Sequence, residues 1–133
     1  MDKQVTAGKK ILVVDDDQAM LLSVEQRLKS WGLTVFTSST GEDALRLAKE
    51  HVPHLILLDI MLPRMKGREV CDKLKADPST KAIPVIFLTA LGLADHIRAG
   101  MNLGADDYLV KPFDPESLKE RIEVCLMRQG PAK

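Results

Sequence analysis

Residues 54–63 read HLILLDIMLP, and this stretch decides the fold. Four consecutive apolar residues, 55–58, run directly into Asp59. An unbroken apolar run of this length, with Pro53 before it, is typical of a strand buried on both faces, as in a parallel sheet. A carboxylate at the end of such a strand is costly to bury. The stretch therefore raises the question of what the acid does there.

The composition indicates one water-soluble domain. The chain has 133 residues, of which 45% are apolar, and its nineteen basic and nineteen acidic side chains cancel. This balance does not favour direct binding to nucleic acid or to an anionic membrane. No apolar stretch approaches the ~20 residues of a membrane span, and the polar start MDKQVTAGKK lacks the apolar core of a signal peptide. We expect a cytoplasmic protein in which Cys71 and Cys125 are buried free thiols.

Strands and helices are predicted to alternate along the chain. Apolar runs predict a strand within 54–63 and others at 9–14, 34–38, 83–89 and 107–110. Helical spacing predicts helices at 18–31, from a Ser39–Glu42 capping box onward, at 67–76, at 93–103, and from Pro115 onward with Asp114 as the N-cap. Five βα units in succession predict an α/β fold, (βα)5, with a five-stranded parallel sheet and helices on both faces.

Polar residues follow the predicted strands at their carboxyl ends. Asp15, Asp16 and Asp17 follow the first strand, Asp59 and Thr89 stand at the ends of the third and fourth, and Lys111 follows the fifth. In the flavodoxin-like strand order 2-1-3-4-5, the first and third strands flank the crevice where ligands bind. The triple aspartate alone could be a turn and helix cap. Its convergence with Asp59 predicts a functional site instead.

The residue types at this edge indicate the chemistry. Carboxylates held close together repel one another, and a hard divalent cation such as Mg²⁺ relieves the repulsion through oxygen ligands. A lysine and a threonine suit the oxygens of a phosphoryl group, and Asp59 is placed to accept that group covalently. We assign no role to Asp17 beyond favouring the N-terminus of the first helix.

Four motifs carry a resemblance to a known family. They are VVDDD (13–17), LLDIMLP (57–63), LTA (88–90) and GADDYLVKPF (104–113), in this order and at fitting separations. On these motifs the chain resembles the receiver domains of two-component response regulators. The resemblance covers roughly residues 9–128, which leaves residues 1–8 as an N-terminal extension and residues 129–133 as a tail or the start of a linker.

The resemblance implies a role for each site residue. Asp59 matches the phosphoacceptor, Thr89 and Tyr108 match the switch pair, and the Lys111–Pro112 bond is expected to be cis. Asp15, Asp16, Asp59 and the backbone carbonyl of Met61 match the ligands of Mg²⁺, for which Mn²⁺ can substitute. Thr89 and Lys111 match the residues that bind phosphoryl oxygens. Met61 and Leu91 match the positions beside the approach of the hydrolytic water.

Rival functions fit the sequence less well. A phosphatase of the haloacid-dehalogenase type needs a second acid two residues after its nucleophilic aspartate, where Met61 stands. A flavin carrier of similar fold binds a phosphate after its first strand, where the triple aspartate would repel it. A receiver that serves only as an interaction module would have lost a site residue, and every one is present here.

The expected function is therefore a phosphorylation-dependent switch rather than a turnover enzyme. A histidine kinase or phosphotransfer protein donates the phosphoryl group to Asp59, and the domain assists its own phosphorylation and dephosphorylation. The change is read on the surface of the fourth helix, fifth strand and fifth helix by an output domain or target protein that the sequence does not identify. Ile97 and Ser117 stand where one receiver subfamily has a dimer-forming ion pair, so we expect a monomer or weak dimer before phosphorylation.

Overall fold

A computed structural model describes residues 7–90 and 104–129. Five strands form one sheet: β1 (Lys10–Val14), β2 (Thr34–Ser38), β3 (Leu55–Asp59), β4 (Val85–Ala90) and β5 (Asp107–Lys111). The helices in these ranges are α2 (Gln18–Ser30), α3 (Gly41–His51), α4 (Gly67–Ala76) and α6 (Pro115–Gln129). The helix predicted at 93–103 lies outside the described residues. Within the described ranges no helix is long and apolar enough to cross a membrane.

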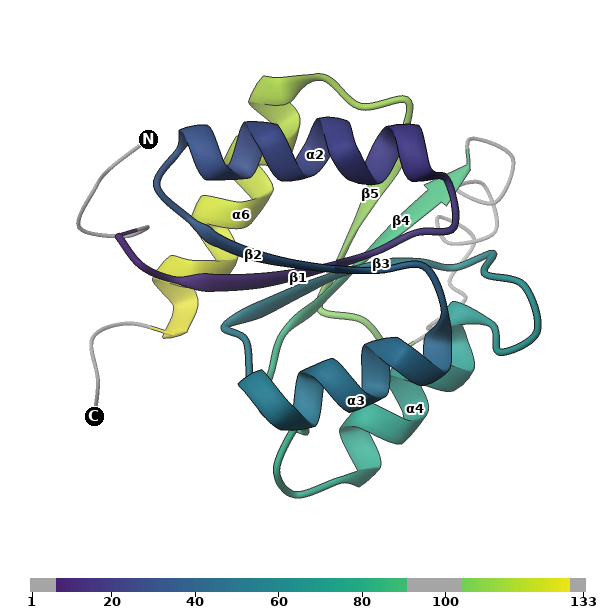
Figure 1. Ribbon diagram of the computed structural model, residues 1–133. Coiled ribbons are helices and arrows are strands. Elements are labelled where there is room, and N and C mark those ends of the chain that lie inside the picture. Colours follow the sequence, from purple (N-terminus) through teal and green to yellow (C-terminus); the bar gives the residue numbers. More distant parts are fainter. Residues whose placement is uncertain (1–6, 91–103, 130–133) are drawn as a thin grey trace.

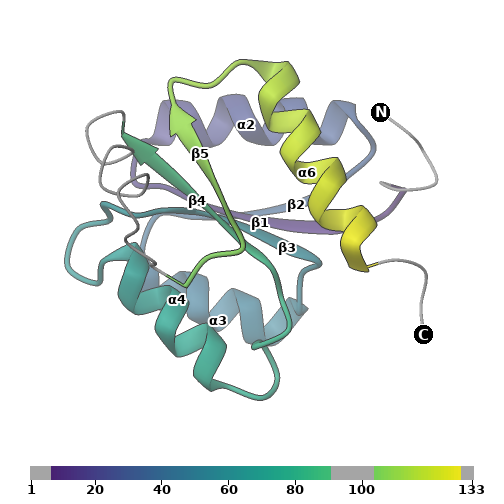
Figure 2. The ribbon, with the colours of Figure 1, turned by 180° about the vertical axis from the view of Figure 1, so that it is seen from behind.

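The sheet has the predicted topology. All four strand pairings are parallel, and the order is β2-β1-β3-β4-β5. Helices α2 and α6 cover one face of the sheet, and α3 and α4 cover the other, as both views show (Figure 1, Figure 2). The prediction of a doubly covered, flavodoxin-like α/β fold is thus confirmed.

Two apolar layers hold the helices on the sheet. Successive side chains of a strand point to opposite faces, so Leu57 joins the layer beneath α2 and α6 while Leu58 joins the layer beneath α3 and α4. All of β3 is buried, which explains why its sequence is an unbroken apolar run. Cys71 and Cys125 are buried free thiols, one in each layer, as predicted.

The helix starts follow the predicted chemistry with one correction. Asp17 and Asp114 accept hydrogen bonds from the N–H groups of Met20 and Ser117, so each caps the helix that follows it. The capping box predicted from Ser39 and Glu42 is wrong. Thr40 is the N-cap of α3, and its Oγ1 accepts from the N–H of Asp43 at 3.2 Å. The buried hydroxyl of Ser38 bonds the backbone of Thr40 in both directions, which keeps residue 40 extended and delays the helix by one residue.

The strand register brings the polar ends together. β1 ends at Val14, immediately before Asp15, and Val14 pairs with Leu58, immediately before Asp59. On the other side of β3, Asp59 pairs with Leu88, and Ala90 pairs with Lys111. The strand predicted at 83–89 is shifted to Val85–Ala90, since the N–H of Ile83 donates to the carbonyl of Thr80 in the preceding turn and Pro84 has no N–H to donate. The carboxyl ends of four central and edge strands therefore meet at one edge.

Candidate functional site

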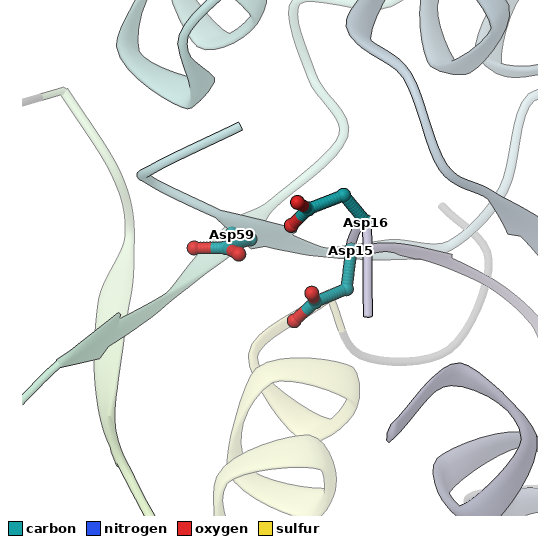
Figure 3. A group of neighbouring side chains, drawn as sticks. All are labelled: Asp15, Asp16 and Asp59. Atoms are coloured by element: carbon teal, nitrogen blue, oxygen red, sulfur yellow. The ribbon is translucent and has the colours of Figure 1, made fainter. Parts of the chain in front are cut away.

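Three carboxylates gather at the carboxyl edge of the sheet. Asp15 and Asp16 follow β1, Asp59 ends the neighbouring β3, and one carboxylate oxygen from each lies within 4.8 Å of the others (Figure 3). Asp15 is 1% exposed and Asp59 is 7% exposed, whereas Asp16 is exposed to solvent. The cluster thus combines two buried acids with one that reaches into water, and this set of hard oxygen donors could hold a divalent cation.

Backbone groups fix the two buried acids. Asp15 Oδ1 accepts from the N–H of Asp17 at 2.9 Å, and Asp59 Oδ1 accepts from the N–H of Met61 at 3.0 Å. Each acid therefore bonds the amide two residues further on, an arrangement that aspartate favours in turns. The N–H of Asp15 also donates to the carbonyl of Ser38 at the end of β2. The loops hold these carboxylates before any ligand arrives.

Lys111 ties the acids to the last strand. Its Nζ lies 2.6 Å from Asp15 Oδ2 and 3.3 Å from Asp59 Oδ2. Burial acts to lower the pKa of Lys111, but the hydrogen bond to Asp15 and the negative charges of Asp59 and Asp15 outweigh it, so this pKa lies above its usual value. Lys111 is thus a firmly charged counter-ion shared by two acids.

Burial has the opposite consequence for Asp15. Desolvation raises the pKa of Asp15 above its usual value, and the neighbouring charge of Asp59 adds to this. The hydrogen bonds from Lys111 and from the N–H of Asp17 oppose the rise without cancelling it. The ionised form of Asp15 is therefore less stable here than in water, and additional positive charge near it would stabilise that form.

Of the other predicted residues in the described ranges, Thr89, Met61 and Pro112 stand at or just after the carboxyl ends of their strands, whereas Tyr108 is the second residue of β5. Thr89 is the last residue but one of β4; its side chain is buried, and its hydroxyl is 3.3 Å from the carbonyl oxygen of Ala90. The side chain of Met61 is 57% exposed. Tyr108 is half-buried, with its ring 6.0 Å from that of Phe87. The Lys111–Pro112 bond is cis, as the resemblance implied. Leu91 and Ile97 lie outside the described residues.

The model of the response regulator receiver domain family matches residues 11–123. The chain belongs to this family. It is 42% identical over 133 residues to the probable transcriptional regulator ycf27 of Guillardia theta, an alignment that covers 99% of the chain and 51% of that protein. The receiver fold and the two-component regulator family are therefore established for this chain.

Solved structures agree with the family match. A putative response regulator from Chloroflexus aurantiacus superimposes with a TM-score of 0.84 at 35% identity, covering 91% of this chain and 99% of that one. The receiver domain of a sensor histidine kinase from Pseudomonas aeruginosa PAO1 gives a TM-score of 0.78 at 31% identity, covering 90% and 98%, and holds a magnesium ion in its active-site cleft. The receiver domain spans about half the length of the curated relatives that it matches.

The Lys111 pair predicts a pH-dependent loss of stability. Replacing Lys111 with Met leaves the buried Asp15 without its counter-ion, which should cost about 1–3 kcal/mol of the free energy of unfolding at pH 7.5 in EDTA. Because the pKa of Asp15 is already raised above 3.8 in the folded protein, its contribution to stability is present at low pH and is lost as pH rises through the folded value. Lys111→Met should raise the pKa of Asp15 in the folded protein further. The loss in free energy of unfolding caused by the substitution should therefore become smaller as the pH falls towards 5.

Urea unfolding at several pH values measures this effect. Lys29→Met is the matched control, because exposed Lys29 forms an i,i+4 pair with the half-buried Glu25 at 3.0 Å, and such pairs within a helix are worth about 0.5 kcal/mol. Equal losses for Lys111→Met and Lys29→Met, or a loss for Lys111→Met that does not change with pH, would show that Lys111 does not neutralise Asp15.

Proposed function

We propose that this receiver domain is a phosphorylation-driven switch in which Asp59 accepts a phosphoryl group from a phosphohistidine. The donor is a histidine kinase or a phosphotransfer protein. The single observation that carries the proposal is the placement of Asp59, a nearly buried carboxylate whose Oδ2 is 3.3 Å from an ammonium group and whose neighbours are two further acids. Family membership is consistent with it.

The proposed step is an in-line displacement at phosphorus. A carboxylate oxygen of Asp59 forms the new O–P bond while the N–P bond of the phosphohistidine breaks, and the electron pair of that bond stays on the imidazole nitrogen. The carboxylate of Asp59 is the attacking group, and the ammonium group of Lys111 lies 3.3 Å from its Oδ2. The imidazole nitrogen takes up a proton from solvent as the N–P bond breaks, so the products are an acyl phosphate on Asp59 and a neutral histidine on the donor.

The acidic cluster fits Mg²⁺, or Mn²⁺ in its place. The proposed ligands are Asp15, Asp16, Asp59 and the backbone carbonyl of Met61. When bound, the cation would offset the negative charge of the carboxylates and of the incoming phosphoryl oxygens. In the described part of the chain, the ammonium group of Lys111 contacts two of these three carboxylates, so an excess of negative charge remains that a divalent cation can balance.

Thr89 and Lys111 are proposed to bind the phosphoryl oxygens. Lys111 would exchange part of its contact with Asp59 for a phosphoryl oxygen, and the hydroxyl of Thr89 would leave the carbonyl of Ala90 to donate to another. Movement of Thr89 would free space that Tyr108 then fills, which changes the surface around β5. A half-buried position of Tyr108 is compatible with such a turn.

The signal passes to an output domain or target protein. The curated relative described above is a probable transcriptional regulator of about twice the aligned length, so a DNA-binding output is one form that this partner could take. We propose a monomer or weak dimer before phosphorylation. Arg121 and Asp107, which could have bridged two copies, already pair within the chain at 3.3 Å.

A phosphatase remains the rival function, and Met61 argues against it. The residue two places after the nucleophile must act as a general acid and base in that class. Met61 has no titratable group, although its exposed side chain stands where such a group would be needed. The domain is proposed to assist its own phosphorylation and dephosphorylation without turning over small phosphate esters.

The first test of this function concerns the acceptor. Asp59→Asn should abolish stoichiometric labelling by acetyl phosphate or by a cognate kinase, because an amide has no negative charge with which to attack phosphorus. The far-UV circular dichroism spectrum should stay unchanged. Asp72→Asn, which alters an exposed aspartate of α4, should be labelled like the wild type. An acid-stable, stoichiometric label on Asp59→Asn would show that another residue is the acceptor.

The second test concerns the metal. Millimolar Mg²⁺ should raise the melting temperature of the unphosphorylated wild type, since a ligand that binds only the folded state stabilises it. Asp16→Ala should lose most of this shift. Without metal it should be as stable as the wild type or more so, because removing one of three neighbouring acids relieves repulsion. Asp17→Ala should keep the shift, although it should melt lower because it loses a helix cap. An undiminished Mg²⁺ shift in Asp16→Ala would exclude the ligand role.

The third test concerns the lifetime of the phosphorylated form. The apolar side chains of Met61 and Leu91 cannot hold the hydrolytic water by hydrogen bonding. Loss of such a contact can slow a step about 10–100-fold. We expect a long-lived phosphorylated form, and we expect Met61→Asn to shorten its life. Phosphate release from purified labelled protein measures this, and a wild-type lifetime of seconds that Met61→Asn leaves unaltered would contradict the expectation.

A further inference from the structure

The first residue of α4 lies against the backbone of Asp59. A Cβ atom placed on Gly67 would stand 2.8 Å from Ile60 Cα and 3.0 Å from the carbonyl carbon of Asp59, and closer still to the carbonyl oxygen of Asp59. Real Cβ atoms essentially never approach other atoms this closely, and all three atoms belong to the main chain, which cannot turn aside as a side chain can. Any other residue at position 67 must therefore displace the Asp59–Ile60 peptide.

Space is the visible reason for this glycine. The described glycines with positive φ are Gly8, Gly32 and Gly104, so Gly67 does not occupy the left-handed region that favours glycine. It stands instead at the first position of a helix, where its backbone conformation does not require glycine. The helix start also lacks the usual capping side chain, since Lys66 makes no cap hydrogen bond. In place of a cap, the N–H of Gly67 donates to the carbonyl of Ile60 at 2.9 Å.

The Asp59–Ile60 peptide and the Ile60–Met61 peptide that follows it are consequently each held by a backbone hydrogen bond. The N–H of Ile60 donates to Leu88 of β4 at 3.2 Å, while the carbonyl of Ile60 accepts from Gly67. The next amide, that of Met61, donates to the carboxylate of Asp59 itself. A shift of the Asp59–Ile60 peptide would move the carboxylate of Asp59 and the amide of Met61 that orients it. It would thereby alter the 3.3 Å contact between Asp59 and Lys111.

We propose that Gly67 is a positioning residue for phosphoryl transfer to Asp59. By letting α4 close onto the peptide that follows Asp59, it sets the direction of the carboxylate towards phosphorus and towards Lys111. The inference rests on the proposed function of Asp59. None of the roles assigned above belongs to a side chain of α4. The inference is that the position of α4 nevertheless controls the rate of the chemical step.

Gly41 provides a matched control. It is the first residue of α3 and is also buried, and a Cβ there would stand 2.8 Å from Val70 Cγ2 and 3.0 Å from Met65 Cβ. These neighbours are side chains, and none belongs to Asp59 or Ile60. Gly41→Ala therefore introduces the same methyl group against side chains of α4 and of the loop before it, with milder crowding and without touching the acceptor.

The experiment compares Gly67→Ala, Gly41→Ala and the wild type in labelling by radioactive acetyl phosphate with saturating Mg²⁺. Rates are taken at a temperature at which circular dichroism shows each protein to be folded, and are expressed per folded molecule. Gly67→Ala should lower the maximal rate about 10–100-fold, because a displacement of about 1 Å costs that much in a well-aligned reaction. The acetyl phosphate concentration for half-maximal rate should change little, since the loss lies in the chemical step. Gly41→Ala should keep the wild-type maximal rate.

A second readout does not depend on phosphorylation. The amide resonance of Met61 in a nitrogen–proton correlation spectrum reports its hydrogen bond to Asp59, and it should shift in Gly67→Ala but not in Gly41→Ala. If the wild type takes no label, the proposed function of Asp59 fails, and the Met61 resonance still decides whether Gly67 sets the position of the carboxylate. An unmoved resonance together with a wild-type maximal rate in Gly67→Ala would overturn the inference.

A second variant covers the case in which Gly67→Ala does not fold. One glycine inserted after Arg64, in the exposed part of the loop between β3 and α4, lengthens the connection and lets α4 withdraw from Asp59 without adding an atom beside it. The same fall in maximal rate and the same shift of the Met61 resonance are expected. A wild-type rate and spectrum in the insertion variant would show that closure of α4 onto Asp59 does not position the acceptor.

Discussion

The ion pair of Lys111 with Asp15 and Asp59 is the interaction on which the rest of the site depends. Two carboxylates that are almost completely buried would be costly side by side without a counter-ion. Lys111 supplies one positive charge to both, at 2.6 and 3.3 Å. The balance remains incomplete, because burial still raises the pKa of Asp15 and the exposed Asp16 adds a third acid. Additional positive charge would therefore stabilise the folded site. This property suits a domain whose proposed chemistry requires a cation.

The sheet makes this arrangement possible by gathering distant segments at one edge. The ends of β1 and β3 contribute the acids, and the ends of β4 and β5 contribute the hydroxyl and ammonium groups, so the site is assembled from four neighbouring strands. Apolar layers on both faces fix the strands, and backbone bonds within the loops fix the carboxylates. Such preorganisation matters because catalysis of phosphoryl transfer depends mainly on aligning the reacting groups and on stabilising charge, and little on covalent chemistry by other side chains.

Most of the fold could be predicted from the sequence because its signals are local. The apolar run before Asp59 predicts a strand buried on both faces, helical spacing predicts the covering helices, and Asp17 and Asp114 stand where helix caps belong. The cap of α3 was misplaced by one residue. Ser39 and Thr40 are both good caps in isolation, and the hydroxyl of buried Ser38 decides between them through its bonds to residue 40. The choice of cap depends on the burial of Ser38 in the folded protein, and the periodicity of the sequence does not specify that burial.

The sequence by itself determined which residues stand at the ends of the strands, and therefore which side chains the site contains. Only the tertiary structure decided how they are paired. Lys111 is separated from Asp15 by 96 positions and from Asp59 by 52, and nothing in either segment indicates that the lysine binds Asp15 more closely than Asp59. The need for glycine at position 67 is likewise invisible in a helical pattern, because it arises from the backbone of β3 lying against the first turn of α4. Strand ends follow from local periodicity, whereas distances between them follow from how the sheet and helices close on one another.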